Sequence, residues 1–183
     1  MQRTILWQNT RTLGAEYATL AQREDGWQLA GLVVSVADGK PLEVRYVVRT
    51  DPQWRTRSAE VRRVMPDGEA ELRLTSDGAG AWWRDGAALP DLAGCLDVDL
   101  GVTPSTNTLP IRRLDLAVGA GAEVAAAWVR FPGLEVSHLE QRYERLAADR
   151  WRYHSATFQA ELAVDEAGLV LDYAGVWRAI ARE

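Results

Sequence analysis

The stretch from Gly94 to Leu116 reads Gly-Cys-Leu-Asp-Val-Asp-Leu-Gly-Val-Thr-Pro-Ser-Thr-Asn-Thr-Leu-Pro-Ile-Arg-Arg-Leu-Asp-Leu, and it departs from the alternating pattern around it. It opens as a strand, in which leucine and valine side chains share one face while Asp97 and Asp99 share the other. Because they stand two residues apart on one strand, the two carboxylates are expected about 7 Å from each other. The apolar face is expected to hold this strand against the core, which makes the two acids a polar focus.

A short helix is expected directly after this strand. Thr103 has the side chain of an N-cap, and Pro104 fits the first helical position, where proline loses no hydrogen bond. Pro110 is expected to end or kink the helix, because it lacks the N–H that an interior turn needs. Arg112 and Arg113 follow at once, so two acids, a hydroxyl-rich turn and two arginines lie within one short stretch.

The rest of the chain alternates apolar and polar residues in short segments bounded by Gly, Pro and Asp turns, a pattern that predicts β-strands. The expected strands are residues 4–8, 13–23, 27–36, 42–49, 54–65, 69–75, 81–84, 113–118, 123–131, 134–146, 150–157, 158–164, 169–173 and 177–180. Turns spaced about 8–12 residues apart indicate an all-β sandwich, a barrel or a strongly curved sheet. No linker or repeat divides the chain, so we expect one domain over residues 1–183.

Some of these segments carry a more specific expectation. Residues 27–36 are apolar on both faces, so this strand is expected to be covered on both sides. Residues 113–118 and 123–131 are expected to form a hairpin around the glycines between them. Residues 134–146 contain good helix formers, but hairpin-spaced strands follow them and favour a strand.

The composition excludes several classes of function. The 183 residues carry 21 Lys and Arg against 26 Asp and Glu, and this net charge of −5 argues against a nucleic-acid partner. Cys95 is the only cysteine and the histidines number 2, so neither a disulfide nor a metal site is expected, and no motif indicates a cofactor. No apolar run is long enough for a signal peptide or a membrane span, so we expect a soluble, cytoplasmic protein.

The acid pair has three interpretations that the sequence leaves open. Asp97 and Asp99 are suited to accept hydrogen bonds from sugar hydroxyls. They are also compatible with the acid and base of an inverting glycosidase, whose carboxyl groups stand about 6.5–9.5 Å apart. Alternatively, they lie on a solvated face or pair with Arg112 and Arg113. The hydroxyl-rich turn over residues 103–108 likewise fits either a polar or anionic ligand or ordinary helix capping.

Tryptophan is abundant, with 8 residues, and its flat apolar face suits both sugar stacking and core packing. Most of these side chains are expected in the core of the sheet. Trp54 and the pair Trp82 and Trp83 are the better candidates for a surface site, because they follow turns. Cys95 is expected to be a buried, unreactive thiol.

Several motifs together resemble a known family. The most specific run is residues 94–100 continuing into residues 103–114, and supporting motifs lie at residues 51–57, 141–143 and 164–173. On these motifs the chain resembles, over nearly its whole length, a family of bacterial glycolipid-binding proteins.

The resemblance implies a large curved antiparallel sheet, open and barrel-like, wrapped around one short central helix and remotely like lipoprotein-carrier folds. It also implies a tight homodimer and an acidic pocket. That pocket corresponds best to Asp97 and Asp99, and next to Asp172.

The leading hypothesis is therefore a non-catalytic protein that binds a glycolipid or related amphiphile, with a role in glycolipid or cell-envelope metabolism. Asp97 and Asp99 would accept hydrogen bonds from the sugar, and the curved sheet would shelter the acyl part. The remaining candidate ligand contacts are Thr103, Asn107, Arg112, Arg113, Trp54 and Asp172.

Two further hypotheses follow from the same residues. The first is a hydrolase or lyase of sugar conjugates, in which Asp97 or Asp99 acts as acid or base. The second is a structural dimer without a small ligand, in which the arginine-rich segment at residues 54–65 or the tryptophans form the interface.

Overall fold

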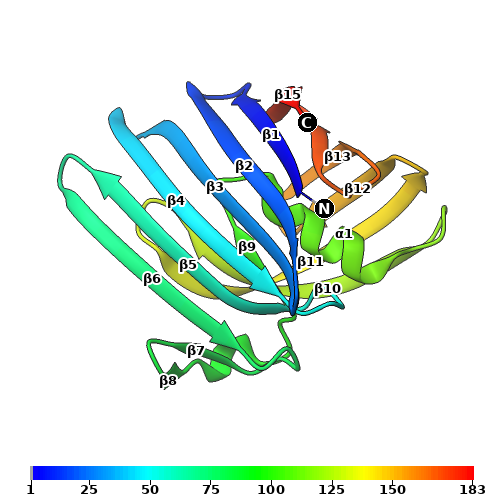
Figure 1. Cartoon of the computed structure of the whole chain (residues 1–183), viewed down its shortest axis with the longest axis horizontal. Helices are drawn as coiled ribbons and strands as arrows, with labels where there is room; N and C mark the ends of the chain where they lie inside the picture. The colour runs from blue at the N-terminus through cyan, green and yellow to red at the C-terminus, as the bar shows by residue number, and fades with distance from the viewer. Residues whose placement is uncertain (1) are drawn as a thin grey trace.

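The computed structural model describes residues 2–183, which form one 15-stranded sheet curved around a short helical segment (Figure 1). The first strands are β1 (Gln2–Asn9), β2 (Gly14–Arg23), β3 (Gly26–Ala37), β4 (Lys40–Thr50), β5 (Thr56–Met65), β6 (Gly68–Ser76), β7 (Trp82–Arg84), β8 (Ala87–Ala88) and β9 (Asp97–Leu100). The later strands are β10 (Gly121–Arg130), β11 (Glu135–Ala147), β12 (Arg150–Ser155), β13 (Phe158–Val164), β14 (Val170–Tyr173) and β15 (Trp177–Arg182). The helical segments are η1 (Pro90–Leu92), η2 (Ser105–Asn107) and α1 (Thr108–Leu114). The expectation of a large curved sheet around one short helix is confirmed.

The sheet is ordered β8-β7-β6-β5-β4-β3-β2-β1-β15-β14-β13-β12-β11-β10-β9. Neighbouring strands are antiparallel except β9 and β10, which run parallel. β1 pairs with β15 in the middle of the sheet, so the two ends of the chain join its N-terminal and C-terminal halves. The backbones of Thr4 and Glu183 extend this seam with two hydrogen bonds of 2.9 Å.

The strand β9 has both faces inside the molecule because the sheet rolls over on itself. Val98 and Leu100 are about 1% and 0% exposed and belong to the main core, which covers the inner faces of β1 to β7. The backbone N–H of Val98 also donates to the hydroxyl of Thr56 at the start of β5, over 3.1 Å. Asp97 and Asp99 face the opposite way, toward a second core around Tyr143 and neighbouring strands.

The helix begins and ends later than the sequence predicts. Pro104 precedes the turn η2, and α1 follows it as a separate seven-residue helix. Pro110 lies in the first turn of α1, where no intrahelical hydrogen bond is lost, so the prediction that it ends the helix is wrong. The helix ends instead at Asp115, which has a left-handed backbone with φ 42°. Among residues 2–183, no helix has both the length and the apolar character to cross a membrane.

Two other expectations need correction. Residues 113–118 do not form a hairpin with residues 123–131, because their first two residues belong to α1; β10 pairs instead with β11. The strand β3 is not covered on both sides, since Val34 and Val36 on its outer face are 54% and 43% exposed. The expectation of a strand over residues 134–146 is confirmed by β11.

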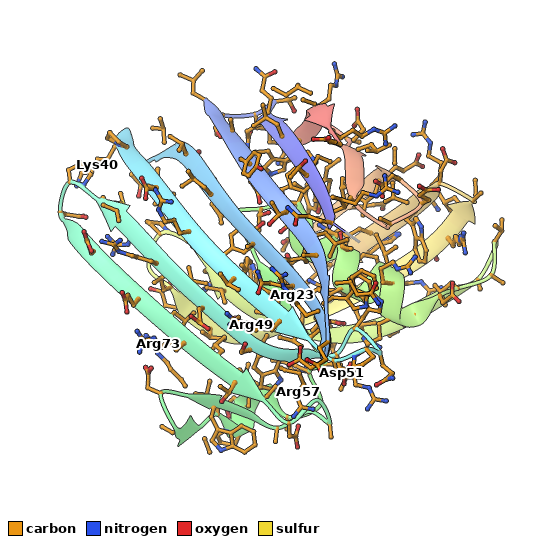
Figure 2. The ribbon with its side chains drawn as sticks, in the orientation of Figure 1. Arg23, Lys40, Arg49, Asp51, Arg57 and Arg73 are labelled. Atoms are coloured by element: carbon orange, nitrogen blue, oxygen red, sulfur yellow. The ribbon has the colours of Figure 1, made fainter. Side chains whose placement is uncertain are left out.

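Three turns of the sheet share one construction, in which an aspartate closes a five-residue loop. In each, the aspartate Oδ1 accepts the N–H groups of the residues two and four positions later, and its own N–H donates to the carbonyl of the latter. The aspartates are Asp51 (labelled in Figure 2), Asp77 and Asp165. The third residue after each has positive φ, and these residues are Trp54 (67°), Gly80 (107°) and Gly168 (82°).

Candidate functional site

A cavity of about 570 Å³ lies where β9 faces the C-terminal strands. Its polar lining includes Asp99, Thr103 and Asn107 from the central stretch of the sequence, together with Arg11, Ser155 and Thr157. Its apolar wall is aromatic, with side chains from β10, β12, β13, β14 and β15. These are Trp128, Tyr153, Phe158, Tyr173 and Trp177. The size is within the range of small-molecule sites, and the mixture of aromatic rings with a few polar groups is typical of them.

Asp99 is the acid of this cavity. The side-chain amide of Gln141 donates to its Oδ2 over 2.6 Å. Burial raises the pKa of Asp99 to about 6, against the opposing effect of hydrogen bonds from Gln141 and Thr106, and the nearby charge of Asp97 adds to the rise. A carboxylate of this kind changes charge in the physiological pH range.

Asp97 has a different environment although it shares the face of Asp99. Its side chain is only 1% exposed, and Arg113 donates to both carboxylate oxygens, at 3.1 Å and 2.6 Å. Burial raises the pKa of Asp97, while the bidentate arginine opposes the rise. Both oxygens are therefore engaged in an ion pair that ties β9 to α1.

Thr103 and Asn107 are held in place by buried partners. The Thr103 hydroxyl donates to Glu16 Oε1 over 2.7 Å, and Tyr46 donates to the same oxygen. Asn107 accepts the hydroxyl of Tyr143 at 2.9 Å. The polar wall is thus fixed before any ligand arrives.

Sequence reasoning missed Glu16, which is completely buried at the middle of this network. Burial raises its pKa to about 8, despite hydrogen bonds from Tyr46 and Thr103 that favour the charged form. A signal was present, because Glu16 occupies an inward position of β2, in register with Gly14, Ala18 and other small or apolar residues. An acid on the inner face of a strand is a candidate for a specific role.

The other predicted site residues lie elsewhere. Arg112 and Trp54 line a separate hollow of about 350 Å³, with the guanidinium 5.4 Å from the ring centroid. Asp172 does not line the large cavity; its carboxylate lies 3.5 Å from Arg178 and is 44% exposed. Arg113 is taken up by Asp97.

Two expectations about individual side chains have clear outcomes. Trp54 and Trp82, both expected at the surface, are buried, at 6% and 2% exposed. The indole N–H of Trp82 donates to the carbonyl of Cys95 over 2.8 Å. The thiol of Cys95 is buried as expected, and burial raises its pKa to about 11, so it stays protonated and unreactive.

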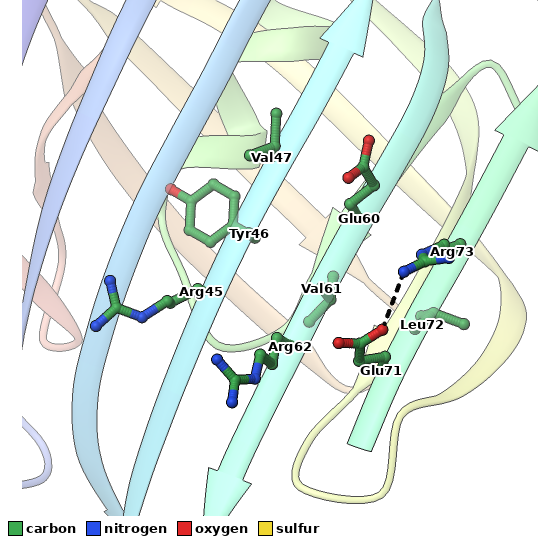
Figure 3. A pocket seen from close by; sticks show the side chains of 9 residues that line it. All are labelled: Arg45, Tyr46, Val47, Glu60, Val61, Arg62, Glu71, Leu72 and Arg73. Atoms are coloured by element: carbon green, nitrogen blue, oxygen red, sulfur yellow. Dashed lines mark hydrogen bonds and ion pairs between the residues drawn. The ribbon is translucent and has the colours of Figure 1, made fainter. Parts of the chain in front are cut away.

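A shallower hollow of about 200 Å³ lies across β4, β5 and β6 (Figure 3). Arginine and glutamate side chains alternate across its rim, and Arg73 pairs with Glu71 at 3.2 Å. Arg49 with Glu60 and Arg62 with Glu69 form comparable pairs on the same strands, each at 2.6 Å. These exposed charges neutralise each other, so this face is best described as a solvated ladder of ion pairs.

The curved sheet around one short helix, with a cavity lined by polar and aromatic side chains, defines a mainly β protein built on a single open sheet. The family described as putative glycolipid-binding matches residues 4–179, and the chain belongs to that family. The chain is also similar to a DUF1089 family protein from Pseudomonas aeruginosa, whose crystal structure was determined at 1.80 Å resolution. The two share 38% sequence identity and a TM-score of 0.82, over 89% of this chain and 91% of the other. Among curated proteins, none matches.

Proposed function

We propose that the cavity around Asp99 binds the sugar head group of a glycolipid or related amphiphile without chemically changing it. The observation that carries this proposal is a cavity of about 570 Å³ that contains the carboxylate of Asp99 and five aromatic side chains. Gln141 donates to one oxygen of this carboxylate. Membership of a family described as glycolipid-binding supports the choice of ligand.

The chemistry of the wall fits a sugar. Ionised Asp99 accepts hydroxyl groups, the Thr103 hydroxyl and the Asn107 amide offer further polar contacts, and aromatic faces pack on the C–H groups of a sugar ring. The acyl part of the ligand extends along the apolar rings of Trp128 and Phe158.

The alternative of a sugar-conjugate hydrolase with Asp97 and Asp99 as acid and base has less support. Such a mechanism requires two carboxyl groups that reach the substrate. Both oxygens of Asp97 are hydrogen-bonded to Arg113, and its side chain is 1% exposed. A binding role needs only Asp99.

Octyl glucoside, a simple sugar amphiphile, tests this proposal through tryptophan fluorescence and calorimetry. Asp99→Asn is expected to weaken binding about tenfold, because a hydrogen bond to a charged acceptor contributes about 1.5–3 kcal/mol. Binding to the native protein should strengthen as the pH rises through about 6, since the ionised form of Asp99 is the better acceptor.

Asp172→Asn is the matched control, because this aspartate pairs with Arg178 outside the cavity. Equal affinities of the Asp99→Asn variant and the native protein would refute the assignment of the cavity. Turnover of chromogenic glycosides by the native protein would support the hydrolase instead.

The proposal extends to the assembly and location of the protein. We propose a homodimer that meets through the outer face of β2 and β3, where Tyr17 and Val34 are 53% and 54% exposed, together with Leu13, which directly precedes β2 and is 83% exposed. Exposed apolar side chains that cluster on one face are characteristic of protein interfaces. The proposed setting is the cytoplasm, where such a dimer would take part in glycolipid or cell-envelope metabolism.

A further inference from the structure

A second hollow, of about 350 Å³, shares no lining residue with the cavity around Asp99. Its apolar wall is the pair Trp27 and Trp54, whose rings stack with centroids 4.5 Å apart and planes inclined by 17°. Its charged side is formed by Arg3, Arg112 and Glu166. Two arginines therefore face this hollow together with one carboxylate.

Of the two arginines that line this hollow, Arg112 is the one without a carboxylate partner among residues 2–183. Glu166 is already paired with Arg3 at 2.6 Å. Arg112 donates only to the backbone carbonyl of Glu166, at 3.3 Å, and no carboxylate within residues 2–183 forms an ion pair with it. A guanidinium has five N–H donors, so most of those on Arg112 remain available to a ligand.

Contacts between α1 and the loop after β13 hold Arg112 in this position. Thr108, one turn earlier on the same face of α1, donates its hydroxyl to the carbonyl of Gly168 over 3.0 Å. A Cβ on Gly168 would lie 2.9 Å from the Cδ of Arg112, so the absence of a side chain there gives the arginine its space. The loop itself is closed by the carboxylate of Asp165. The hollow is thus preorganised.

Trp54 is in a backbone conformation that a bulky residue rarely adopts. It occupies the third position after Asp51, with φ 67°, and the two other loops of this construction have glycine at that position. Left-handed backbone is unfavourable for a non-glycine residue, and such strain is concentrated at functional sites. The strained residue here is the one that supplies the flat wall beneath Arg112.

We propose that this hollow is a second binding site, which takes an anionic amphiphile: a carboxylate or phosphate monoester on a short apolar chain. The acid group pairs with the guanidinium of Arg112, and the chain lies against Trp27, whose partly exposed ring is stacked on the buried ring of Trp54. This site is independent of the sugar-binding proposal, because its residues and its ligand charge are different.

Calorimetry of the full chain with octanoate, octyl phosphate, octyltrimethylammonium and inorganic phosphate tests the proposal. Octanoate and octyl phosphate are expected to bind and to change tryptophan fluorescence. The cationic amphiphile, which has the same chain, and inorganic phosphate, which has none, are each expected to bind at least about tenfold more weakly. Equal affinity for octanoate and octyltrimethylammonium would overturn the role of Arg112.

Variants locate the site. Arg112→Gln is expected to reduce octanoate affinity at least about tenfold. Arg73→Gln removes an exposed arginine of the outer face, visible in Figure 2, and is expected to leave that affinity unchanged. Trp54→Leu keeps an apolar side chain without the flat ring and is expected to weaken octanoate binding. Because Trp54 is 6% exposed and belongs to the main core, circular dichroism and an unfolding curve check that this variant is folded at the temperature of the titration.

Octyl glucoside separates the two proposals. An excess of this neutral amphiphile is expected not to displace octanoate, whether or not it binds in the larger cavity. Displacement of octanoate by octyl glucoside, or unchanged octanoate affinity in Arg112→Gln, would contradict a second site.

Discussion

Glu16 is an unusual residue because it is an acid that is completely buried in the interior. It is fully buried, Tyr46 and Thr103 both donate to its Oε1, and its Oε2 has no hydrogen-bond partner among residues 2–183. Because burial raises its pKa to about 8, the folded protein keeps this carboxyl protonated at neutral pH. A neutral acid is the form that such a site tolerates.

Glu16 therefore makes stability depend on pH. The unfolded chain releases this proton near the ordinary pKa of 4.5, whereas the folded chain keeps it up to about 8. The contribution of Glu16 is full below pH 4.5 and is lost as the pH rises to 8, at no more than about 1.4 kcal/mol per pH unit. Glu16→Gln is expected to flatten the decrease in the free energy of unfolding between pH 6 and pH 8, as measured by urea denaturation.

The pH range separates Glu16 from Asp99, whose raised pKa of about 6 has the same sign of effect but acts at lower pH. Glu71→Gln on the outer face of β6 is the matched control, because its side chain is 57% exposed and paired with Arg73. Parallel stability curves for native protein and Glu16→Gln would contradict a protonated Glu16.

At the residue scale, the alternation of the sequence placed Asp97 and Asp99 on one face, and the structure has them so. The alternation contains no information on how different their surroundings are. That difference depends on Arg113, which α1 brings back over 16 positions of sequence to Asp97. The structure therefore divides an acid pair that looked equivalent into one structural and one available carboxylate.

At the scale of elements, the strands were predictable because inward and outward positions alternate clearly, and turns contain Gly, Pro or Asp. The errors concern the segment from α1 to β10. Pro110 was expected to break a helix that in fact starts two residues before it. The partner of β10 was misassigned because residues 113–118 contain apolar residues that pack from a helix end and a loop.

The loop that follows β13 gives a test at the element scale. Gly168→Ala places a methyl group in a left-handed backbone, φ 82°, and within 2.9 Å of Arg112. Gly39→Ala imposes similar strain at φ 75°, but nothing lies within 4 Å of its new Cβ. In both variants the free energy of unfolding is expected to fall by about 1–2 kcal/mol, because alanine is less stable than glycine in left-handed backbone.

Only Gly168→Ala is expected to lose more than this and to weaken octanoate binding, because Arg112 must move. Unfolding curves and octanoate calorimetry on the two variants measure the two effects. Identical losses of stability together with unchanged octanoate affinity would show that the contact between this loop and Arg112 has no consequence.

At the scale of the whole molecule, the curved sheet was predictable from the number and spacing of strands. The closure of this curved sheet around its helix was not predictable. It depends on β9, which pairs in parallel with β10 and contacts the start of β5 through Thr56. The outer face of β3 was expected to be covered, and the exposed Val34 and Val36 instead mark the proposed dimer surface.

Val34→Glu tests this surface. A charge in the centre of an apolar interface is expected to convert the homodimer into a monomer, which sedimentation equilibrium measures directly. Val118→Glu is the control, since Val118 is 60% exposed but lies in the loop between α1 and β10. A native protein with the mass of one chain, or a Val34→Glu variant with the mass of two, would remove this surface from consideration.

The seam between β1 and β15 has a consequence for the newly made chain. During synthesis on a ribosome, the first strand emerges long before its second neighbour, which is complete only at Arg182. Until Trp177–Arg182 have been made, one side of β1 keeps its backbone donors and acceptors unpaired, and the pairing that finally satisfies them joins residues more than 160 positions apart in the sequence. The sheet can therefore close only after its last strand has been made, and until then the open edge of β1 is a surface on which another chain could pair.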